Sequence, residues 1–173
     1  MKTSVYIAES LDGFIARVDD GLDWLPVPEG DQDYGYGAFM ETVDVLVMGR
    51  RTFETVLGFG AWSYTKPVVV LSSRPVEIPA DIRDVVEWMD GAPADVVEKL
   101  SRRGAQHLYI DGGQTIQRFL NAGLITDLII TRVPVLLGSG IALFGPQPND
   151  IALRHVGTQS FASGLVQSTY TVV

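Results

Sequence analysis

The chain has no cysteine, and only two of its 173 residues are histidine. Without cysteine, disulfide bonds, thiol catalysis and cysteine metal sites are all excluded. The two histidines, His107 and His155, are far apart in the sequence, and no HExxH or comparable metal-ligand spacing occurs. We therefore expect no metal site.

Basic residues and long apolar runs are also scarce. Lys and Arg number 13 against 21 Asp and Glu, which gives a formal net charge of −8. This balance argues against nonspecific nucleic-acid binding, which needs a basic surface. No stretch approaches the roughly 20 apolar residues of a membrane-spanning helix, and the apolar run in the N-terminal MKTSVYIAES is too short for a signal peptide. We expect a cytoplasmic protein that binds neither nucleic acid nor a membrane.

The rest of the composition is that of a globular protein. Hydrophobic residues make up 46% of the chain and charged residues 20%, and the length favours a single domain over residues 1–173. Short continuous apolar runs predict buried strands at residues 5–8, 45–48, 68–71, 84–89, 107–110 and 127–135. Apolar residues three and four apart predict helices at residues 33–42, 94–103 and 115–122.

The C-terminal part has a different pattern. Residues 154–161 and 165–172 are rich in β-formers and are joined by Ala162-Ser163-Gly164, which predicts an antiparallel hairpin. Strands that alternate with helices, followed by a hairpin, predict an α/β fold whose mostly parallel sheet has an antiparallel edge. Residues 17–36 show no period and are predicted to form a long loop.

Two segments carry the clearest functional pattern: VLVMGRRTFE (45–54) and LYIDGGQTIQRFL (108–120). Each predicts a buried strand, a glycine turn and an amphipathic helix, and a helix N-terminus reached in this way favours anions. Two such corners suggest a ligand with several anionic groups, such as a dinucleotide. A third segment, VVVLSSRP (68–75), places two hydroxyls and a guanidinium after a strand, where they could bind a phosphate. Taken singly, each segment could also be an ordinary turn.

Common nucleotide and hydrolase motifs are missing. The chain has no GxGxxG, no GxSxG and no GxxxxGK[ST], so the usual Rossmann fingerprint, the serine-hydrolase elbow and the P-loop are not supported. Five segments nevertheless occur in the order found in the dihydrofolate-reductase-like superfamily: SLDGFIA, VLVMGRRTFE, VVVLSSRP, LYIDGGQTIQRFL and TDLIITRVPVLLGSGIALF. Together they span nearly the whole chain. They most resemble stand-alone relatives of the reductase domain of the riboflavin-biosynthesis deaminase-reductase.

The resemblance implies a three-layer fold and an NADPH-dependent reductase. By this resemblance the cofactor diphosphate is held by Gly49, Arg50, Arg51 and Thr52. The adenosine 2′-phosphate is surrounded by Leu71, Ser72, Ser73 and Arg74. The diphosphate and nicotinamide ribose are lined by Gly112, Gly113, Gln114 and Thr115, and the nicotinamide is touched by Ala8 and Ile15. Relatives often have a non-proline cis peptide in the glycine turn, so we expect one within residues 111–113.

The resemblance also implies a small heterocyclic substrate, pterin-like or pyrimidine-like. The candidate lining residues are Ser10, Asp12, Trp24, Tyr34, Tyr36 and Phe39, and Asp33 is the candidate catalytic carboxylate. Phe53 and Phe59 could extend an apolar wall. The residue types leave other roles open, because Asp12 can be a turn former and Trp24, Phe39 and Phe53 can be core. A tyrosine or a bound water could supply the proton instead of Asp33.

Three functions remain open at this point. The first is reduction of a small heterocycle, and the second is the reaction of a true dihydrofolate reductase or of the riboflavin-pathway pyrimidine reductase. The third is binding of NADPH without turnover. Zinc-deaminase motifs (HxE, PCxxC) are absent, and so is the Arg- and His-containing stretch that riboflavin-type reductases carry before their second strand. Relatives commonly form dimers, and the C-terminal hairpin offers an edge to bury, so we expect a homodimer.

Overall fold

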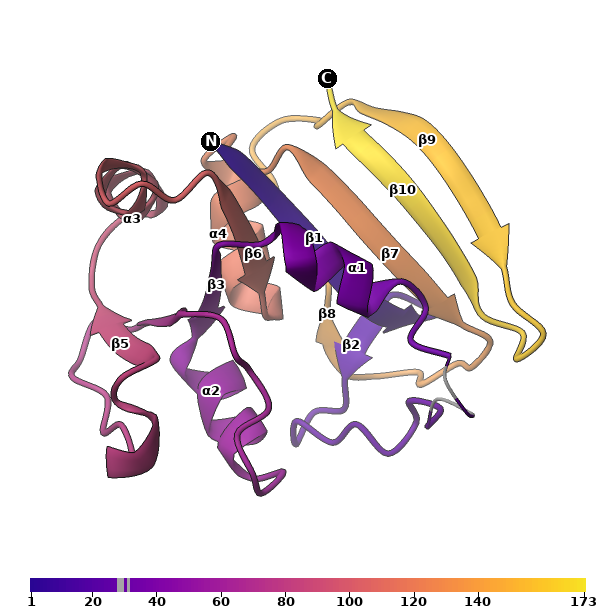
Figure 1. Ribbon diagram of the computed structural model, residues 1–173. Helices are drawn as coiled ribbons and strands as arrows, with labels where there is room; N and C mark the ends of the chain where they lie inside the picture. The colour runs from indigo at the N-terminus through magenta and orange to yellow at the C-terminus, as the bar shows by residue number, and fades with distance from the viewer. Residues whose placement is uncertain (28–29, 31) are drawn as a thin grey trace.

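The computed structural model describes residues 1–27, 30 and 32–173 and is built on one large sheet (Figure 1). Its strands are β1 (Lys2–Ser10), β3 (Val45–Gly49), β4 (Val68–Leu71), β5 (Val86–Met89), β6 (His107–Asp111), β7 (Asp127–Val133), β9 (Leu153–Ser160) and β10 (Val166–Val172). The eight strands lie in the order β5-β4-β3-β6-β1-β7-β10-β9. All neighbouring pairs are parallel except β7–β10 and β10–β9. The predicted mostly parallel sheet with an antiparallel hairpin at its edge is confirmed.

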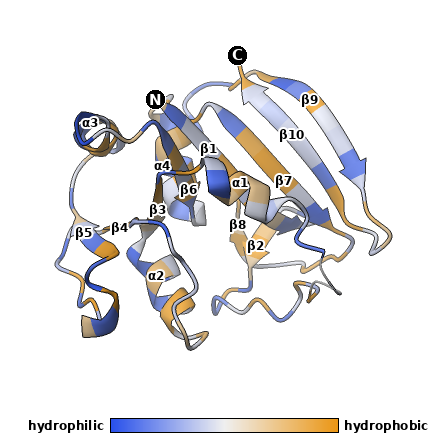
Figure 2. Cartoon of the chain, in the orientation of Figure 1, coloured by the Kyte–Doolittle hydropathy of each residue, from blue (hydrophilic) through white to orange (hydrophobic). Residues whose placement is uncertain are grey.

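Helices cover both faces of the parallel half of the sheet. One face packs against α1 (Tyr36–Thr42) and α2 (Arg50–Leu57), through a core that includes Phe39 and Phe53. The other face packs against α3 (Pro93–Arg102) and α4 (Gly113–Asn121), through a second core. Apolar side chains are therefore needed on both faces of β3 and β4, which explains their continuous apolar runs. Figure 2 shows hydrophilic and hydrophobic residues interleaved around α2, as expected for a helix with one buried side.

The antiparallel end of the sheet is more open. Strand β9 forms the edge, and nearly all of its residues are exposed. The neighbouring β10 is half-buried and is drawn largely pale in Figure 2, because its Ser, Thr and Tyr residues have intermediate hydropathy. An unpaired edge of this kind could be buried between two copies of the chain, and the homodimer stays a prediction.

Tertiary pairing changes several predicted boundaries. Strand β1 runs on to Ser10 because it pairs with β7 over its whole second half, and β7 ends at Val133, just before Pro134. Helix α1 begins at Tyr36 rather than at residue 33. Part of the predicted loop at residues 17–36 lies outside the described residues, namely positions 28, 29 and 31.

Three short elements were not predicted. Strands β2 (Phe14–Ala16) and β8 (Ile141–Ala142) form a separate two-stranded antiparallel sheet, and a 3-10 helix, η1, covers Ala80–Ile82. Runs of two or three residues carry no detectable period, so only their pairing partner in space defines them.

The glycine turn after β6 is built without a cis peptide. None occurs among the described residues, so the cis bond predicted within residues 111–113 is wrong. Gly112 instead has φ of 87° and ψ of 138°, a conformation open almost only to glycine, and this redirects the chain through trans bonds.

The two strand–glycine–helix corners pack directly against each other. A Cβ atom at Gly112 would collide with Thr52 Oγ1, and one at Gly49 would lie 2.9 Å from Thr115 Oγ1. Thr52, three residues after Gly49, therefore packs against Gly112, and Thr115, three residues after Gly112, packs against Gly49. Because β3 and β6 are neighbours in register, with Met48 beside Asp111, the two corners meet at one edge of the sheet.

We expect Gly112→Ala to lower the free energy of unfolding by about 3 kcal/mol or more, because the new methyl group adds a collision to a strained backbone. Gly123→Ala is the matched control, since Gly123 also has a positive φ, 65°, but a Cβ atom added there would have no other atom within 4 Å. That change should cost only about 1 kcal/mol. Urea denaturation measures both, and equal losses would contradict the packing argument.

Candidate functional site

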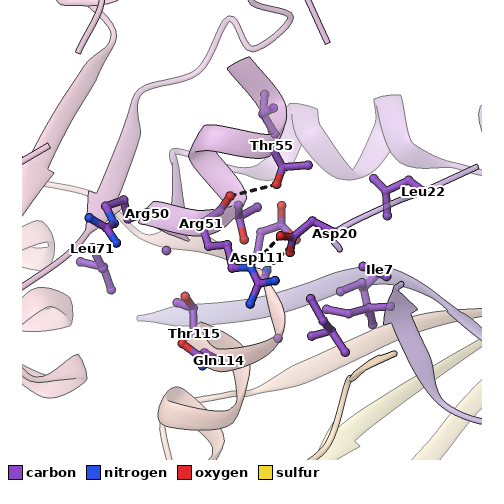
Figure 3. A pocket seen from close by; sticks show the side chains of 18 of the residues that line it. Ile7, Asp20, Leu22, Arg50, Arg51, Thr55, Leu71, Asp111, Gln114 and Thr115 are labelled. Atoms are coloured by element: carbon purple, nitrogen blue, oxygen red, sulfur yellow. Dashed lines mark hydrogen bonds and ion pairs between the residues drawn. The ribbon is translucent and has the colours of Figure 1, made fainter. Parts of the chain in front are cut away.

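A cleft of about 770 Å³ lies along the carboxyl ends of β4, β3 and β6 and beside β1 (Figure 3). Parallel strands place the turns that follow them at one edge of the sheet, which is where α/β proteins bind ligands. All of the residues predicted to bind the cofactor line this cleft: Ala8, Ile15, Gly49, Arg50, Arg51, Thr52, Leu71, Ser72, Ser73, Arg74, Gly112, Gly113, Gln114 and Thr115. Segments far apart in the sequence are therefore joined into one site.

One end of the cleft is cationic. Arg50 begins α2, Arg74 follows β4, and Arg118 reaches from α4 to the carbonyl of Gly91, at 3.4 Å. Arg50 forms a loose, exposed ion pair with Glu54, at 3.6 Å. Among the described residues, Arg74 and Arg118 form no ion pair. This end can therefore attract an anion even though the protein as a whole is acidic.

Arg51 is in a different situation, because a neighbouring loop already binds it. Its Nε donates to Asp20 Oδ2 at 2.7 Å, and its Nη2 donates to the carbonyl of Val18 at 3.2 Å. The pair is partly solvent-exposed, so its contribution to stability is small. Its effect on the site is geometric, since it fastens the loop after β2 to the first turn of α2 and directs the Arg51 guanidinium to that loop.

Asp111, the last residue of β6, places a carboxyl group in the middle of the cleft. The side chain is partly buried, and its Oδ1 accepts the N–H of Gly112 at 2.8 Å. Burial raises the pKa of Asp111 to about 6, although that hydrogen bond works in the opposite direction. A carboxyl group with such a pKa is partly protonated near neutral pH and can donate a proton.

The charge of Asp111 acts on three tyrosines, namely Tyr36, Tyr64 and the core residue Tyr109, whose pKa is raised chiefly by burial. Burial, and secondarily the charge of Asp111, raises the pKa of Tyr36 to about 12 and raises the pKa of Tyr64 as well. Both phenols therefore stay neutral, and neither releases a proton readily. Sequence reasoning missed Asp111, although a signal was present: an acidic residue ends an otherwise apolar strand directly before two glycines.

Asp33, the predicted catalytic carboxylate, lies outside the cleft lining and is exposed. Its two oxygens accept the N–H groups of Gly35 and Gly37, both at 2.9 Å, and these bonds hold its pKa below the ordinary value. Asp33 thus supports the start of α1. Its ionised, hydrogen-bonded carboxylate is poorly suited to proton donation.

Ser10 and Asp12 also lie outside the cleft lining. Ser10 Oγ donates to Asp12 Oδ1 at 2.6 Å and accepts the N–H of Phe14 at 3.0 Å. Asp12 in turn accepts the N–H groups of Leu137 and Gly138. Both residues hold the turn between β1 and β2 against the segment before β8. Asp12 therefore has the turn-forming role that its residue type left open.

The aromatic residues predicted to line the substrate site, Trp24, Tyr34, Tyr36 and Phe39, are likewise placed away from the cleft lining. Phe39 is core, Tyr36 packs edge-on against Tyr6 with ring centroids 5.4 Å apart, and Tyr34 packs edge-on against Phe161 at 4.9 Å. Trp24 is partly buried in the loop after β2. Phe53 is buried in the core, whereas Phe59 lines the cleft.

Several lining residues were not predicted at all. They come from β1, β2 and the loop after it, α2 and the segment after it, the end of β6, α4 and β8, which sequence patterns do not bring together: Ile7, Ala16, Asp20, Leu22, Leu25, Thr55, Val56, Tyr64, Asp111, Arg118 and Ile141.

We expect the stability of the protein to fall as the pH rises from about 4 to about 6, to the extent that Asp111 controls it. In this window the folded state holds a proton on Asp111 (pKa about 6) that the unfolded state has already lost. Asp111→Asn should remove this dependence and raise the free energy of unfolding at pH 7 by about 1–2 kcal/mol. Asp33→Ala, which removes an ionised helix-supporting carboxylate, should lower stability at pH 7. Denaturation curves across this pH range measure both, and a loss of stability in Asp111→Asn would contradict the assignment.

Sequence relatives point to one family. The chain matches the RibD C-terminal domain family over residues 2–167. It is 35% identical to YwjB of Bacillus subtilis (strain 168) over 170 residues, which cover 95% of this chain and 94% of that protein. It is 28% identical to YyaP of the same organism, over 95% of this chain and 91% of that protein. Both relatives are described as uncharacterized.

Solved structures agree. A protein from Shewanella sp. PV-4, provisionally assigned to riboflavin biosynthesis, is 42% identical with a TM-score of 0.94 and covers 100% of this chain and 99% of that one. The bifunctional deaminase/reductase of Thermotoga maritima is 13% identical with a TM-score of 0.76, over 99% of this chain and 56% of that one. A pyrimidine reductase-like protein of Corynebacterium diphtheriae is 16% identical with a TM-score of 0.73, over 99% and 92%. The last two show the fold alone.

The described part of the chain shows neither a candidate metal site nor a candidate membrane-spanning helix. It holds no group of three or more His, Asp or Glu residues that could bind a metal ion. None of its helices is long and apolar enough to traverse a bilayer. The family match, the relatives and the shared fold together establish that the chain belongs to the RibD C-terminal domain family, with a dihydrofolate-reductase-like fold.

Proposed function

We propose that the chain is an NADPH-dependent reductase, which transfers a hydride to a small substrate bound beside Asp111. The observation that carries this proposal is a single cleft with Arg50, Arg74 and Arg118 at one end and a carboxyl group of raised pKa in its middle. Membership of a family with reductase members supports it. The substrate expected from the resemblance is a small, flat heterocycle.

The residues of the cleft fit a phosphorylated dinucleotide. Gly49 and Gly112 let the two corners pack closely against Thr115 and Thr52, so the first turns of α2 and α4, whose backbone N–H groups favour anions, lie together at the cleft. Arg50 would bind the diphosphate, and Arg74 with Ser72 and Ser73 would bind the 2′-phosphate by charge-assisted hydrogen bonds. We propose Arg118, which lines the same end of the cleft, as a further cation for this phosphate.

The nicotinamide end would lie between β1 and β2. Ala8 and Ile15 line the cleft there, and Ile15 Cδ1 lies 3.1 Å from the Cβ position of Gly113, so β2 is packed onto the start of α4. Bound NADPH would supply the hydride, while the protein positions both reactants and excludes water. Asp111 would donate the proton that the reduced C=O or C=N group must gain, since its pKa lies near the working pH.

The alternatives raised by the sequence differ in substrate or in turnover. Family membership favours the riboflavin-type branch over a true dihydrofolate reductase. The name of the Thermotoga protein includes reduction of 5-amino-6-(5-phosphoribosylamino)uracil, so this compound is the first to test as a substrate. An NADPH-binding protein without turnover would bind the cofactor but would not oxidise it, whichever acceptor is added.

Calorimetric titration with NADPH and NADH, followed by an assay of NADPH oxidation with carbonyl and imine acceptors, tests the proposal. We expect binding that favours NADPH and oxidation that depends on an acceptor. Failure to bind either nucleotide would refute it.

We expect Arg74→Ala to weaken NADPH binding roughly 10- to 100-fold, because one charge-assisted hydrogen bond to phosphate is lost. Binding of NADH, which lacks the 2′-phosphate, should hardly change. Arg83→Ala is the matched control, since Arg83 is exposed, donates to the carbonyl of Ile78 and lies outside the cleft. Calorimetry with both nucleotides reads out the selectivity; equal losses for NADPH and NADH would show that Arg74 does not contact the 2′-phosphate.

We expect the kcat of the wild-type protein to fall as the pH rises through about 6, because a general acid must be protonated and the pKa of Asp111 is about 6. Asp111→Asn should lower kcat roughly 10²- to 10⁴-fold and flatten the pH profile. Asp33→Asn distinguishes the two carboxylates, since it should leave the profile unchanged. If the pH profile of kcat became flat in Asp33→Asn and stayed unchanged in Asp111→Asn, Asp33 and not Asp111 would be the proton donor.

A further inference from the structure

The cleft has two halves that differ in chemistry. Sheet order places the turns after β4 and β3 at one side and β1 at the other, with β6 between them. Figure 3 shows the same separation, with Arg50 and Leu71 at one end, Ile7 and Leu22 at the other, and Asp111, Asp20 and Arg51 between. The first half carries Arg50, Arg74 and Arg118. The second half is the space that the cofactor would leave to the substrate.

The substrate half has no uncommitted cation among its described residues. Arg50, Arg74 and Arg118 belong to the first half, and Arg51 donates to Asp20 at 2.7 Å. The remaining ionisable groups that line this half are Asp20, which is paired with Arg51, and Asp111, whose carboxyl would carry the proton to be donated. A phosphate monoester carries a charge of about −1.5 to −2 at neutral pH. In this half it would meet no uncommitted cation among the described residues to offset its desolvation.

The walls of this half are apolar. Leu22 and Leu25 come from the loop after β2, Val56 comes from the last turn of α2, and Phe59 lies two residues beyond that helix. Phe59 is 65% exposed although it lines the cleft. An exposed aromatic ring on the wall of a cavity is a surface that a flat ligand can cover. The Arg51–Asp20 pair holds the leucine-bearing loop near α2 and so sets the distance between the two walls.

We infer that the substrate half accepts an uncharged, flat aromatic or heteroaromatic carbonyl or imine compound and rejects phosphorylated substrates, with Asp20 and Phe59 as specificity-determining residues. This inference rests on the proposed function. In the reaction, a hydride from the dihydronicotinamide carbon adds to the carbon of the C=O or C=N bond, and the Asp111 carboxyl donates its proton to the oxygen or nitrogen. NADP⁺ and an alcohol or amine result, and Asp111 regains a proton from water.

The test has a cofactor step and a substrate step. Calorimetry with NADPH comes first, and absence of binding would refute the proposed function itself. The NADP⁺-saturated protein is then titrated, by thermal shift, with a panel of uncharged aromatic aldehydes, diketones and unphosphorylated pterins, and separately with ribose 5-phosphate. NADPH oxidation is measured with the same panel and with 5-amino-6-(5-phosphoribosylamino)uracil. We expect members of the uncharged panel to bind and be reduced, and the two phosphorylated compounds to do neither.

Two variants identify the residues responsible. Phe59→Ala should raise the Kd and the KM of the best uncharged substrate roughly tenfold while leaving the Kd of NADPH unchanged. Phe144→Ala is its matched control, because Phe144 is 42% exposed and lies outside the cleft. Asp20→Asn frees the Arg51 guanidinium and should confer measurable binding of ribose 5-phosphate.

The inference is overturned, with the proposed function intact, by any of three results after NADPH binding has been shown. These are reduction of the phosphorylated uracil with a higher kcat/KM than any uncharged compound, failure of the whole uncharged panel to bind the NADP⁺ complex, or an unchanged Kd in Phe59→Ala.

Discussion

The site depends on the close packing of two chain corners that are about sixty residues apart. Gly49 receives Thr115 and Gly112 receives Thr52, and a side chain on either glycine would push the corners apart. Because β3 and β6 are adjacent and parallel, this contact brings the first turns of α2 and α4 to one edge of the sheet, although the two helices cover opposite faces. Backbone N–H groups from both helices thereby converge, which is the basis of anion binding in such folds.

Charge is distributed around these corners in a way that the net charge does not reveal. The protein is acidic overall, yet its cleft gathers four arginines. Arg51 is held by Asp20, whereas Arg50, Arg74 and Arg118 lie at the end of the cleft beside β4. The electrostatic character therefore changes along the cleft, from cationic beside β4 to apolar and acidic beside β1. A ligand with phosphates at one end and an uncharged ring at the other would match both halves.

Asp111 shows how stability and function oppose each other at this site. Its burial at the end of β6 raises its pKa, which means that the ionised form destabilises the fold. The same shift keeps a proton available near neutral pH. Asp33 is the opposite case, since backbone N–H groups stabilise its charge and its contribution is to the start of α1. The two carboxylates have different roles because their surroundings differ.

The sequence by itself determined the main strands and helices and most of the residues in the arginine-bearing half of the cleft. Apolar runs such as 45–48 and 68–71 mark strands that are buried on both faces, and each predicted cofactor motif is continuous in the chain, so the residues next to a strand end could be named in advance. Only the tertiary structure decided the substrate half. Leu22, Phe59 and Asp111 line one cleft because a loop, the segment after a helix and a strand end lie close together, and no local pattern encodes that arrangement. The geometry of the glycine turn was likewise decided by φ and ψ at Gly112, which residue type alone leaves free.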